Sequence, residues 1–464
     1  MDNIQVIGGG TVLTLDGERR VIRDGAVAVE DDRIVRVGKT AEVRAAYPEA
    51  EFLDVEGDAV LPGLVDAHVH LAQALIRGCA DDLSLIPWLT ERVWVLQGSF
   101  DEEDGRTCAE LCILEMLRSG TTAFVETLIA GRYGLDGIAE TVEKSGIRAG
   151  LAKSIMDVAT YAKSPLPMFE GMVEDKEQTF RQARELYEKW HGRGDGRIQV
   201  WLGPRPLGGS TPECLRQVAA LSRELGIRMN IHFCEVRGDV EFFREQYDRR
   251  PTELFEELGL LGPDMMLIHA VWLDDEDVAT LVRTGTHVVH NPASNAKLGS
   301  GIARVPDLLR AGVNVALGCD GGPSNNNYDM FLEMRLASYL NKVNHLDPTV
   351  TPAETVLEMA TLGGARAMGL EKEIGSLQAA KKADLVVVDL HKPHIVPSPD
   401  PVSAVVCAAR GTDVRHVMID GRWVVRDEKV LTLDEEAVLA RAAERAEALY
   451  KRAGVDIKPR WPVV

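Results

Sequence analysis

Histidine and acidic residues follow several apolar segments of this chain, in a pattern that could hold a metal ion. His68 and His70 stand two residues apart at the end of such a segment, so on a β-strand their side chains point to the same face. His232 and Asp320 end two later segments. Three imidazole nitrogens and one carboxylate oxygen suit Zn²⁺ or Fe²⁺ and leave room for a water. The pattern predicts one divalent metal, which would lower the pKa of that water.

Further residues near this metal are expected to move protons. Glu235 lies three residues after His232, and we expect it to carry a proton between the water and the substrate; an exposed loop carboxylate is the alternative. His269 ends another apolar segment and is expected to polarise the substrate or hold the attacking water. Asp320 could serve as a base as well as a ligand. His290 ends a further segment and could either support the metal ligands or be purely structural.

The elements that must position these residues alternate along the middle of the chain. Eight short apolar segments predict buried strands, at 60–66, 121–126, 147–153, 198–203, 227–232, 265–269, 287–290 and 313–318. Helical patterns lie between most of them, as over 102–119, 212–225, 274–284 and 305–311. Eight strand–helix units favour a (β/α)8 TIM barrel over an open doubly wound sheet, because no Gly-rich phosphate loop follows the first strand. Catalytic groups of such a barrel lie at the carboxyl ends of the strands.

The end of the fourth predicted strand bears on the number of metal ions. A lysine there, once carbamylated, could bridge two metals. The strand instead ends Trp201-Leu-Gly-Pro204, without a lysine. A single metal is therefore favoured.

Both ends of the chain predict a second, smaller domain. Residues 1–59 contain short β-branched segments separated by turns with Gly and Asp, and a similar pattern returns within 371–433. Two such segments can pair into one β-sandwich, with the hydrolase barrel of residues 60–370 inserted between them. The remaining residues, 434–464, predict a C-terminal helix that begins at Asp434, followed by a tail.

Charge and composition limit the partners of the protein. Its 464 residues include 52 Lys and Arg against 72 Asp and Glu, and a net charge of −20 disfavours binding to nucleic acid or to an anionic membrane. The first residues lack the pattern of a signal peptide, and no apolar run reaches the ~18 residues that span a bilayer. The 7 cysteines include no CxxC pair, which fits a reducing cytoplasm. We expect a cytoplasmic homo-oligomer that acts on a small molecule.

Five stretches carry a family resemblance: PGLVDAHVHL within 61–71, RGCADDLSLIPWL at 77–89, IHFCE at 231–235, HNPASNAKLGSGIARV at 290–305 and GCDGGPSNNNYDMFLEMRLAS at 318–338. With them the chain resembles the amidohydrolase superfamily, and most closely its branch of S-adenosylhomocysteine/methylthioadenosine deaminases and triazine hydrolases. The resemblance covers nearly the whole chain and implies a barrel with a β-sandwich built from both chain ends. It also implies one Zn²⁺, or Fe²⁺ as in some members, with proton transfer by Glu235 and substrate contact by His269. The implied metal ligands are His68, His70, His232 and Asp320.

The same resemblance implies where the substrate binds. In the nucleoside deaminases a Glu follows a Trp-containing stretch and binds ribose hydroxyls; here Gln97, a neutral amide, stands there. The triazine hydrolases look similar at Gln97 and at Gln73, whereas the Ser-Asn-Asn-Asn loop, in which Ser324 and Asn325 could orient Asp320, looks like the nucleoside deaminases. Trp272 stands where deaminases often carry a second His and is expected to reshape the pocket wall. The expected substrate contacts are Gln73, Trp94, Gln97, Arg148 and His269.

These observations predict a metal-dependent aminohydrolase acting on an amino-substituted aromatic N-heterocycle. The favoured substrate is a 6-aminopurine nucleoside such as S-adenosylhomocysteine or methylthioadenosine. The alternatives are an s-triazine chlorohydrolase or aminohydrolase, and a guanine-type or pterin-type deaminase, because one barrel and one metal serve all of these reactions and only the pocket differs. A non-enzymatic scaffold is disfavoured, because every expected ligand residue is present.

Overall fold

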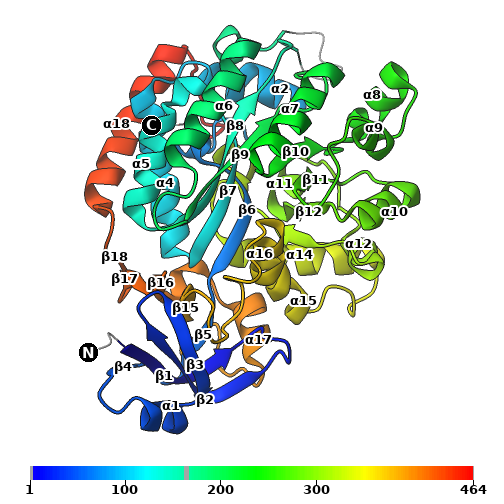
Figure 1. Ribbon diagram of the computed structural model, residues 1–464. Coiled ribbons are helices and arrows are strands. Elements are labelled where there is room, and N and C mark those ends of the chain that lie inside the picture. The colour runs from blue at the N-terminus through cyan, green and yellow to red at the C-terminus, as the bar shows by residue number, and fades with distance from the viewer. Residues whose placement is uncertain (1–3, 161–166, 463–464) are drawn as a thin grey trace.

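Two nine-stranded sheets organise residues 4–160 and 167–462, the part of the chain that the computed structural model describes (Figure 1). One of the two sheets is parallel, and its strands pair in chain order. They are β6 (Leu64–His70), β7 (Thr121–Ile129), β8 (Arg148–Ile155), β9 (Ile198–Pro204), β10 (Met229–Phe233), β11 (Met265–His269), β12 (His287–His290), β13 (Val315–Leu317) and β14 (Asp320–Gly321).

The parallel sheet closes on itself. β13 pairs with β12, while β14 pairs with β6, so the two short strands are successive parts of one strand that is interrupted at Gly318 and Cys319. Counted in this way, the described residues form eight barrel strands, which confirms the predicted (β/α)8 barrel.

Helices cover the outside of this barrel (Figure 1). Helix α7, for example, begins at Thr211, whose side chain accepts a hydrogen bond from the Cys214 N–H, and it ends at Gly226 in the left-handed conformation. Its residues Leu215 and Val218 lie on one face and are buried. The helices along the barrel are α2 (Leu85–Pro87), α3 (Trp94–Gln97), α4 (Glu102–Arg118), α5 (Leu135–Ser145), α6 (Lys176–Trp190), α7 (Pro212–Leu225), α8 (Arg237–Tyr247), α9 (Pro251–Glu257), α10 (Asp275–Thr284), α11 (Pro292–Lys297), α12 (Val305–Ala311), α13 (Gly322–Asn325), α14 (Met330–His345), α15 (Ala353–Glu358) and α16 (Gly364–Ala367).

Side chains fill the barrel interior. Small residues alternate with a few large ones along the strands, so the interior is a packed core and not a channel. The buried cluster contains Val65, Ala67, Ala123, Val125, Ala152, Trp201, Met266, Ile268, Val289 and Ala316.

Strands from both chain ends form the second sheet, as expected from the sequence. Figure 1 shows them together at the lower end of the molecule, below the barrel. Their order is β18-β17-β16-β15-β5-β1-β2-β3, with β4 paired to β1. The bounds are β1 (Ile4–Leu13), β2 (Val21–Glu30), β3 (Arg33–Lys39), β4 (Glu51–Asp54), β5 (Ala59–Pro62), β15 (Leu385–Val388), β16 (Val414–Ile419), β17 (Arg422–Arg426) and β18 (Lys429–Val430); the short helices α1 (Thr40–Ala46) and α17 (Pro401–Ser403) accompany them.

The first predicted barrel strand, 60–66, is divided between the two sheets. Residues up to Pro62 belong to β5, which pairs with β15, and the barrel strand β6 begins only at Leu64. Gly63 separates them, and a Cβ there would lie 2.0 Å from Thr122 Oγ1, so only glycine fits. The strand pairing thus places the change from one sheet to the other at Gly63; the proposed domain boundaries stay predictions.

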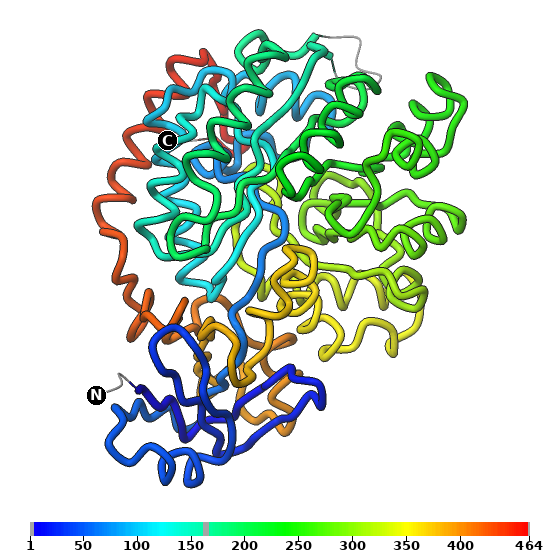
Figure 2. The backbone as a smooth tube through the Cα atoms, in the orientation of Figure 1, coloured from blue at the N-terminus to red at the C-terminus, as the bar shows by residue number. Residues whose placement is uncertain are grey.

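The C-terminal helix α18 (Glu435–Ala453) runs along α4 on the flank of the barrel (Figure 2). Its N-cap is the predicted Asp434, whose side chain accepts a hydrogen bond from the Ala437 N–H. Among the described residues, no helix is both long and apolar enough to cross a membrane.

Candidate active site

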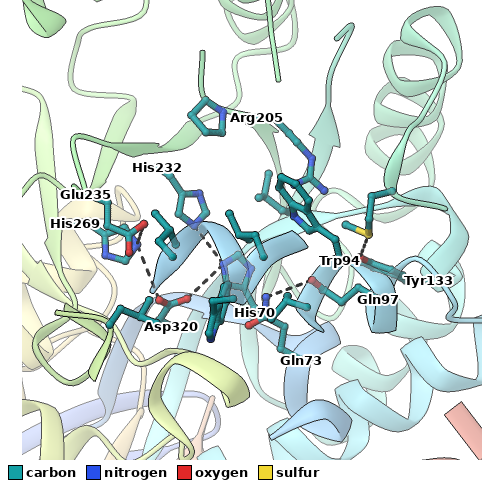
Figure 3. Close-up of a pocket in the computed structure, with 18 residues that line it drawn as sticks. His70, Gln73, Trp94, Gln97, Tyr133, Arg205, His232, Glu235, His269 and Asp320 are labelled. Carbon is teal, nitrogen blue, oxygen red and sulfur yellow. Dashed lines mark hydrogen bonds and ion pairs between the residues drawn. The ribbon is translucent and has the colours of Figure 1, made fainter. Parts of the chain in front are cut away.

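Four predicted metal ligands converge at the carboxyl ends of β6, β10 and the β13–β14 strand. Figure 3 shows three of them, His70, His232 and Asp320. His70 Nε2 lies 3.2 Å from His232 Nε2 and 3.4 Å from Asp320 Oδ1. His68 Nε2 lies 3.2 Å from the same carboxylate oxygen. One donor atom from each of the three histidines lies within 4.8 Å of the other two. The arrangement brings together the donor set that the sequence predicts.

These donors fit a single divalent cation. His68 Nδ1 is bonded to Thr127 Oγ1 at 2.6 Å, whereas its Nε2 is buried without a hydrogen bond among the described residues. Burial, together with the neighbouring His68, lowers the pKa of His70 to about 3, so its imidazole is neutral, the form that binds metals. Burial alone would raise the pKa of Asp320, but the neighbouring His68, 3.2 Å from its carboxylate, holds it well below its usual range. An ionised carboxylate and neutral imidazoles are the ligands of a hydrolytic metal site.

Glu235 and His269 lie directly beside the ligands. Glu235 Oε2 is 3.7 Å from His269 Nε2, and that nitrogen is 4.0 Å from Asp320 Oδ2. Glu235 is only 5% exposed, which excludes the solvated loop carboxylate considered as its alternative. Burial raises the pKa of Glu235, so the carboxyl can be protonated closer to neutral pH, as a proton carrier requires.

The backbone is strained at three positions around these groups. Cys234, His269 and Asp320 have φ of 48°, 70° and 66°, in the left-handed region that non-glycine residues rarely adopt. Such strain is concentrated at functional sites, where the surrounding structure holds it. Here it turns the chain sharply after β10 and β11 and within the last barrel strand.

One segment, α11 and the turn that follows it, supports the acidic and basic groups. Ser294 Oγ donates to Asp320 Oδ2 at 2.6 Å, and Asn295 Oδ1 lies 2.9 Å from His269 Nδ1. The expected supports of Asp320 act differently: Ser324 Oγ bonds the Gly321 backbone, and Asn325 Nδ2 donates to the Cys319 carbonyl. They fix the chain on both sides of Asp320 and not its carboxylate.

A cavity opens onto these groups. Gln73, Trp94, Gln97 and His269, four of the expected substrate contacts, line it together with apolar side chains (Figure 3). Gln97 Oε1 accepts a hydrogen bond from Gln73 Nε2 at 3.4 Å, and Gln97 Nε2 donates to the Ala72 carbonyl at 3.1 Å. The full lining is His70, Gln73, Leu85, Trp88, Leu89, Val93, Trp94, Gln97, Leu128, Tyr133, Met172, Arg205, Pro206, His232, Glu235, His269, Leu298 and Asp320.

The fifth expected contact, Arg148, lies elsewhere, and that prediction is wrong. Arg148 is the first residue of β8, at the amino end of the barrel. Its guanidinium lies 3.1 Å from Asp384 and 2.7 Å from Asp420, two acidic residues of the terminal segments, and its side chain is 4% exposed. Because active groups occupy the carboxyl ends of barrel strands, an arginine at the start of a strand faces away from them.

The structure also places three other residues near or away from the cavity. Trp272 does not line the cavity but a separate surface groove. His290 is buried with neither ring nitrogen hydrogen-bonded among the described residues, and it does not line the cavity. Arg205 lines the cavity although the sequence reading did not select it; it follows β9 directly, so the rule that barrel sites lie at strand ends could have found it.

Fold and site together define a metal-dependent barrel hydrolase. The model of the Amidohydrolase family matches residues 59–424, and that of an Imidazolonepropionase-like composite domain of bacteria matches residues 25–50. A 5-methylthioadenosine/S-adenosylhomocysteine deaminase of Moorella thermoacetica is 40% identical over 435 residues, which cover 94% of this chain and 97% of that protein. The chain belongs to the amidohydrolase family, as the resemblance predicted.

Two further proteins are similar over almost their whole length. A 5′-deoxyadenosine deaminase of Methanosarcina acetivorans is 38% identical over 448 residues, which cover 97% of this chain and 99% of that protein. The solved structure of an adenosine deaminase from Xanthomonas campestris with bound zinc superposes with a TM-score of 0.90 at 32% identity, covering 96% of this chain and 98% of that one. These matches support a divalent metal at the site.

Proposed function

We propose that this protein is a metal-dependent deaminase that hydrolyses the amino group from an aromatic N-heterocycle and releases ammonia. The observation that carries the proposal is the position of Glu235 and His269, 3.7 Å apart, beside three imidazoles and a carboxylate at the floor of a cavity. The proposed substrate is a 6-aminopurine nucleoside, of the methylthioadenosine, S-adenosylhomocysteine or 5′-deoxyadenosine type. The names of two similar proteins support this class.

The residues divide the chemistry between them. His68, His70, His232 and Asp320 would hold a divalent ion, which would supply Lewis-acid activation of water. Glu235 takes a proton from the attacking water and delivers it to the ring nitrogen beside the carbon that is attacked. Asn295 holds His269 Nδ1, so the other ring nitrogen, Nε2, faces the space beside Glu235. His269 can therefore hold the oxygen of the attacking water. Asp320 Oδ2, 4.0 Å from His269 Nε2, is placed to take the second proton from the hydroxyl that has added to the ring carbon and to pass it to the amino group, which departs as ammonia.

The cavity suits a nucleoside with an apolar substituent. Aromatic and aliphatic side chains dominate its wall, among them Trp88, Trp94, Tyr133 and Met172. A flat purine and a short apolar tail, as in methylthioadenosine and 5′-deoxyadenosine, bury well against such groups. The paired amides of Gln73 and Gln97 are the proposed contacts of the ribose, as neutral hydrogen-bonding groups.

Ammonia release tests the proposal directly. Metal-loaded protein is assayed with methylthioadenosine, S-adenosylhomocysteine, 5′-deoxyadenosine, adenosine, guanine, a pterin, melamine and a chloro-triazine, with chloride measured for the last. We expect rapid release from the adenosine derivatives. Turnover of a triazine or a free base alone would reject the nucleoside and favour the alternatives.

We further propose Zn²⁺ as the native metal, with Fe²⁺ as the alternative, and a cytoplasmic homo-oligomer. The zinc proposal is supported by a site of three nitrogens and one oxygen, a common zinc set. Metal analysis of protein purified without added metal tests it, and light scattering after gel filtration tests the oligomer. Iron as the dominant metal would reject the zinc proposal. A monomer at all concentrations would reject the homo-oligomer.

A further inference from the structure

Ser300 contacts Glu235 without occupying the cavity. It lies between Gly299 and Gly301 in the turn after α11, is 4% exposed, and donates from Oγ to Glu235 Oε1 at 3.2 Å. Ser300 is not among the residues that line the cavity. Its hydroxyl therefore holds one oxygen of the carboxylate and leaves Oε2, which lies 3.7 Å from His269 Nε2, for the reacting atoms.

Two hydrogen bonds fix the backbone of Ser300. Its N–H donates to the Asn295 carbonyl at 2.9 Å, and Asn295 is the residue that holds His269. Its carbonyl accepts the indole N–H of Trp272 at 2.9 Å. The backbone from which the hydroxyl extends is thus fixed, and the hydroxyl reaches Glu235 by rotation about the Cα–Cβ bond alone.

Trp272 holds both sides of the Glu235 loop. Its backbone N–H donates to the carbonyl of Cys234, the residue before Glu235, at 3.1 Å, while its indole holds Ser300. The ring packs directly on Gly301, where a Cβ would lie 2.9 Å from Trp272 Cζ2. The Arg237 guanidinium lies 4.2 Å from the ring centroid and adds a cation–π contact.

We propose that Ser300, held by Trp272, is a positioning residue that orients the Glu235 carboxylate for proton transfer. The inference rests on the proposed function, because it assigns a role to Ser300 within that reaction. Misplacing a catalytic group slows the chemical step more than it weakens substrate binding. The loss of the Ser300 hydroxyl should therefore appear in kcat and not in KM.

Three variants separate the parts of this arrangement. S300A removes the hydroxyl and should lower kcat about 10-fold with KM changed less than about twofold, since a shift of about 1 Å in a catalytic group can cost ~10²-fold. S300T keeps a hydroxyl and should restore kcat to within about threefold of wild type. W272F keeps an aromatic ring, although a smaller one, but loses the indole N–H, and should lower kcat about threefold. The S300A/W272F protein should be no slower than S300A, because Trp272 acts through Ser300.

Two matched controls remove the same groups elsewhere. S338A loses a buried serine hydroxyl that bonds the Thr351 carbonyl, and W423F loses an indole N–H that bonds Gln5 Oε1 in the terminal sheet. Both should keep wild-type kcat. Should S300A fail to fold, W272F decides alone, since it keeps the Ser300 hydroxyl and an aromatic ring at position 272.

Crystal structures supply a readout that needs no turnover. In wild type, Glu235 Oε1 should lie within hydrogen-bond reach of Ser300 Oγ, and in S300A the carboxylate should leave that position. Wild-type kcat in S300A, or an unmoved Glu235, would overturn the positioning role. If wild type deaminates no compound of the panel, the proposed function fails, and the crystal structures then decide the positioning role separately.

Discussion

Burial sets the protonation of the site residues. Desolvation, together with the other site histidines, lowers the pKa of His232 well below its usual value. Burial alone would raise the pKa of Asp320, but His68 reverses this rise. Desolvation raises the pKa of Glu235, even though His269 opposes the rise. One buried cluster thus contains neutral imidazoles, an ionised carboxylate and a proton carrier. The neighbours of each group set its protonation state.

A single amide tests the ribose contact. Q97E replaces a neutral acceptor with a carboxylate beside Gln73 Nε2, 3.4 Å away. Because charge-assisted hydrogen bonds are stronger by about 1 kcal/mol, kcat/KM for an adenosine derivative should rise about fivefold. Steady-state kinetics on methylthioadenosine measure this, with the free base guanine or adenine as the comparison. An equal change for riboside and free base would show that Gln97 does not contact the sugar.

The sequence predicts the residues at strand ends but not the residues that support them. His68, His70, His232, His269 and Asp320 could be found because the barrel rule needs only the order of strands. Ser294 and Ser300 contact Asp320 and Glu235 through the packing of α11, which is a tertiary contact without a local pattern. Arg148 was misassigned for the same reason, since its partners Asp384 and Asp420 are more than 200 residues away in sequence.

At the scale of elements, a buried ion pair ties a wall of the cavity to the barrel. Glu174 follows the short helix η4 (Glu170–Met172), which carries Met172 into the cavity. Glu174 Oε1 accepts from Lys153 Nζ of β8 at 3.0 Å and from the Gly131 N–H at 2.8 Å. The Lys153 side chain is fully buried, so this carboxylate is its charge partner in the described residues.

Breaking that pair should loosen the cavity wall. E174Q leaves Lys153 without a charged partner, and we expect KM for the nucleoside to rise about 3- to 10-fold with a smaller change in kcat, because binding contacts and not reacting groups move. E177Q, an exposed glutamate of α6 three residues later, is the matched control. A lower kcat with unchanged KM would place the effect at the chemical step and contradict this role.

The division of residues 60–66 shows what an apolar pattern leaves open. Both β5 and β6 are fully buried, so hydrophobicity runs continuously across Gly63. The change of sheet depends on which partner each half meets, β15 for β5 and β7 for β6. Pairing partners so far apart in sequence are not encoded in a local pattern, although the glycine itself marks the change.

At the scale of the whole molecule, an ion cluster joins the barrel to the terminal sheet. Arg148 and Arg197 come from the barrel, and Asp384 and Asp420 from the terminal segments. R148M leaves two buried carboxylates poorly paired, which typically costs about 3–5 kcal/mol. We expect a clear loss of thermal stability but unchanged KM per folded enzyme. The control R184Q, which removes an exposed ion pair with Glu224, should lower the stability by at most ~1 kcal/mol. A raised KM in R148M would contradict this structural role and indicate that Arg148 contacts the substrate.

Buried neutral histidines should make stability depend on pH. Burial lowers the pKa of His416, on β16, to about 4, and that of His287 also to about 4. The unfolded chain therefore binds more protons than the folded chain between about pH 6.5 and 4, so stability falls as the pH falls through this window. H416Q should remove up to ~1.4 kcal/mol per pH unit from that slope. Melting temperatures from pH 7 to 4 measure it, and an unaltered slope in H416Q would contradict the assignment.

The most direct measurement compares metal content and ammonia release of wild type and E235Q. Glu235 is not among the four convergent donors, so E235Q should retain the wild-type amount of metal. Its kcat for an adenosine derivative should fall by about 10²–10⁴, the usual contribution of general acid–base catalysis, while the surface variant E253Q stays at wild-type activity. Near wild-type ammonia release by metal-loaded E235Q would contradict the account of this site as a deaminase centre built around Glu235.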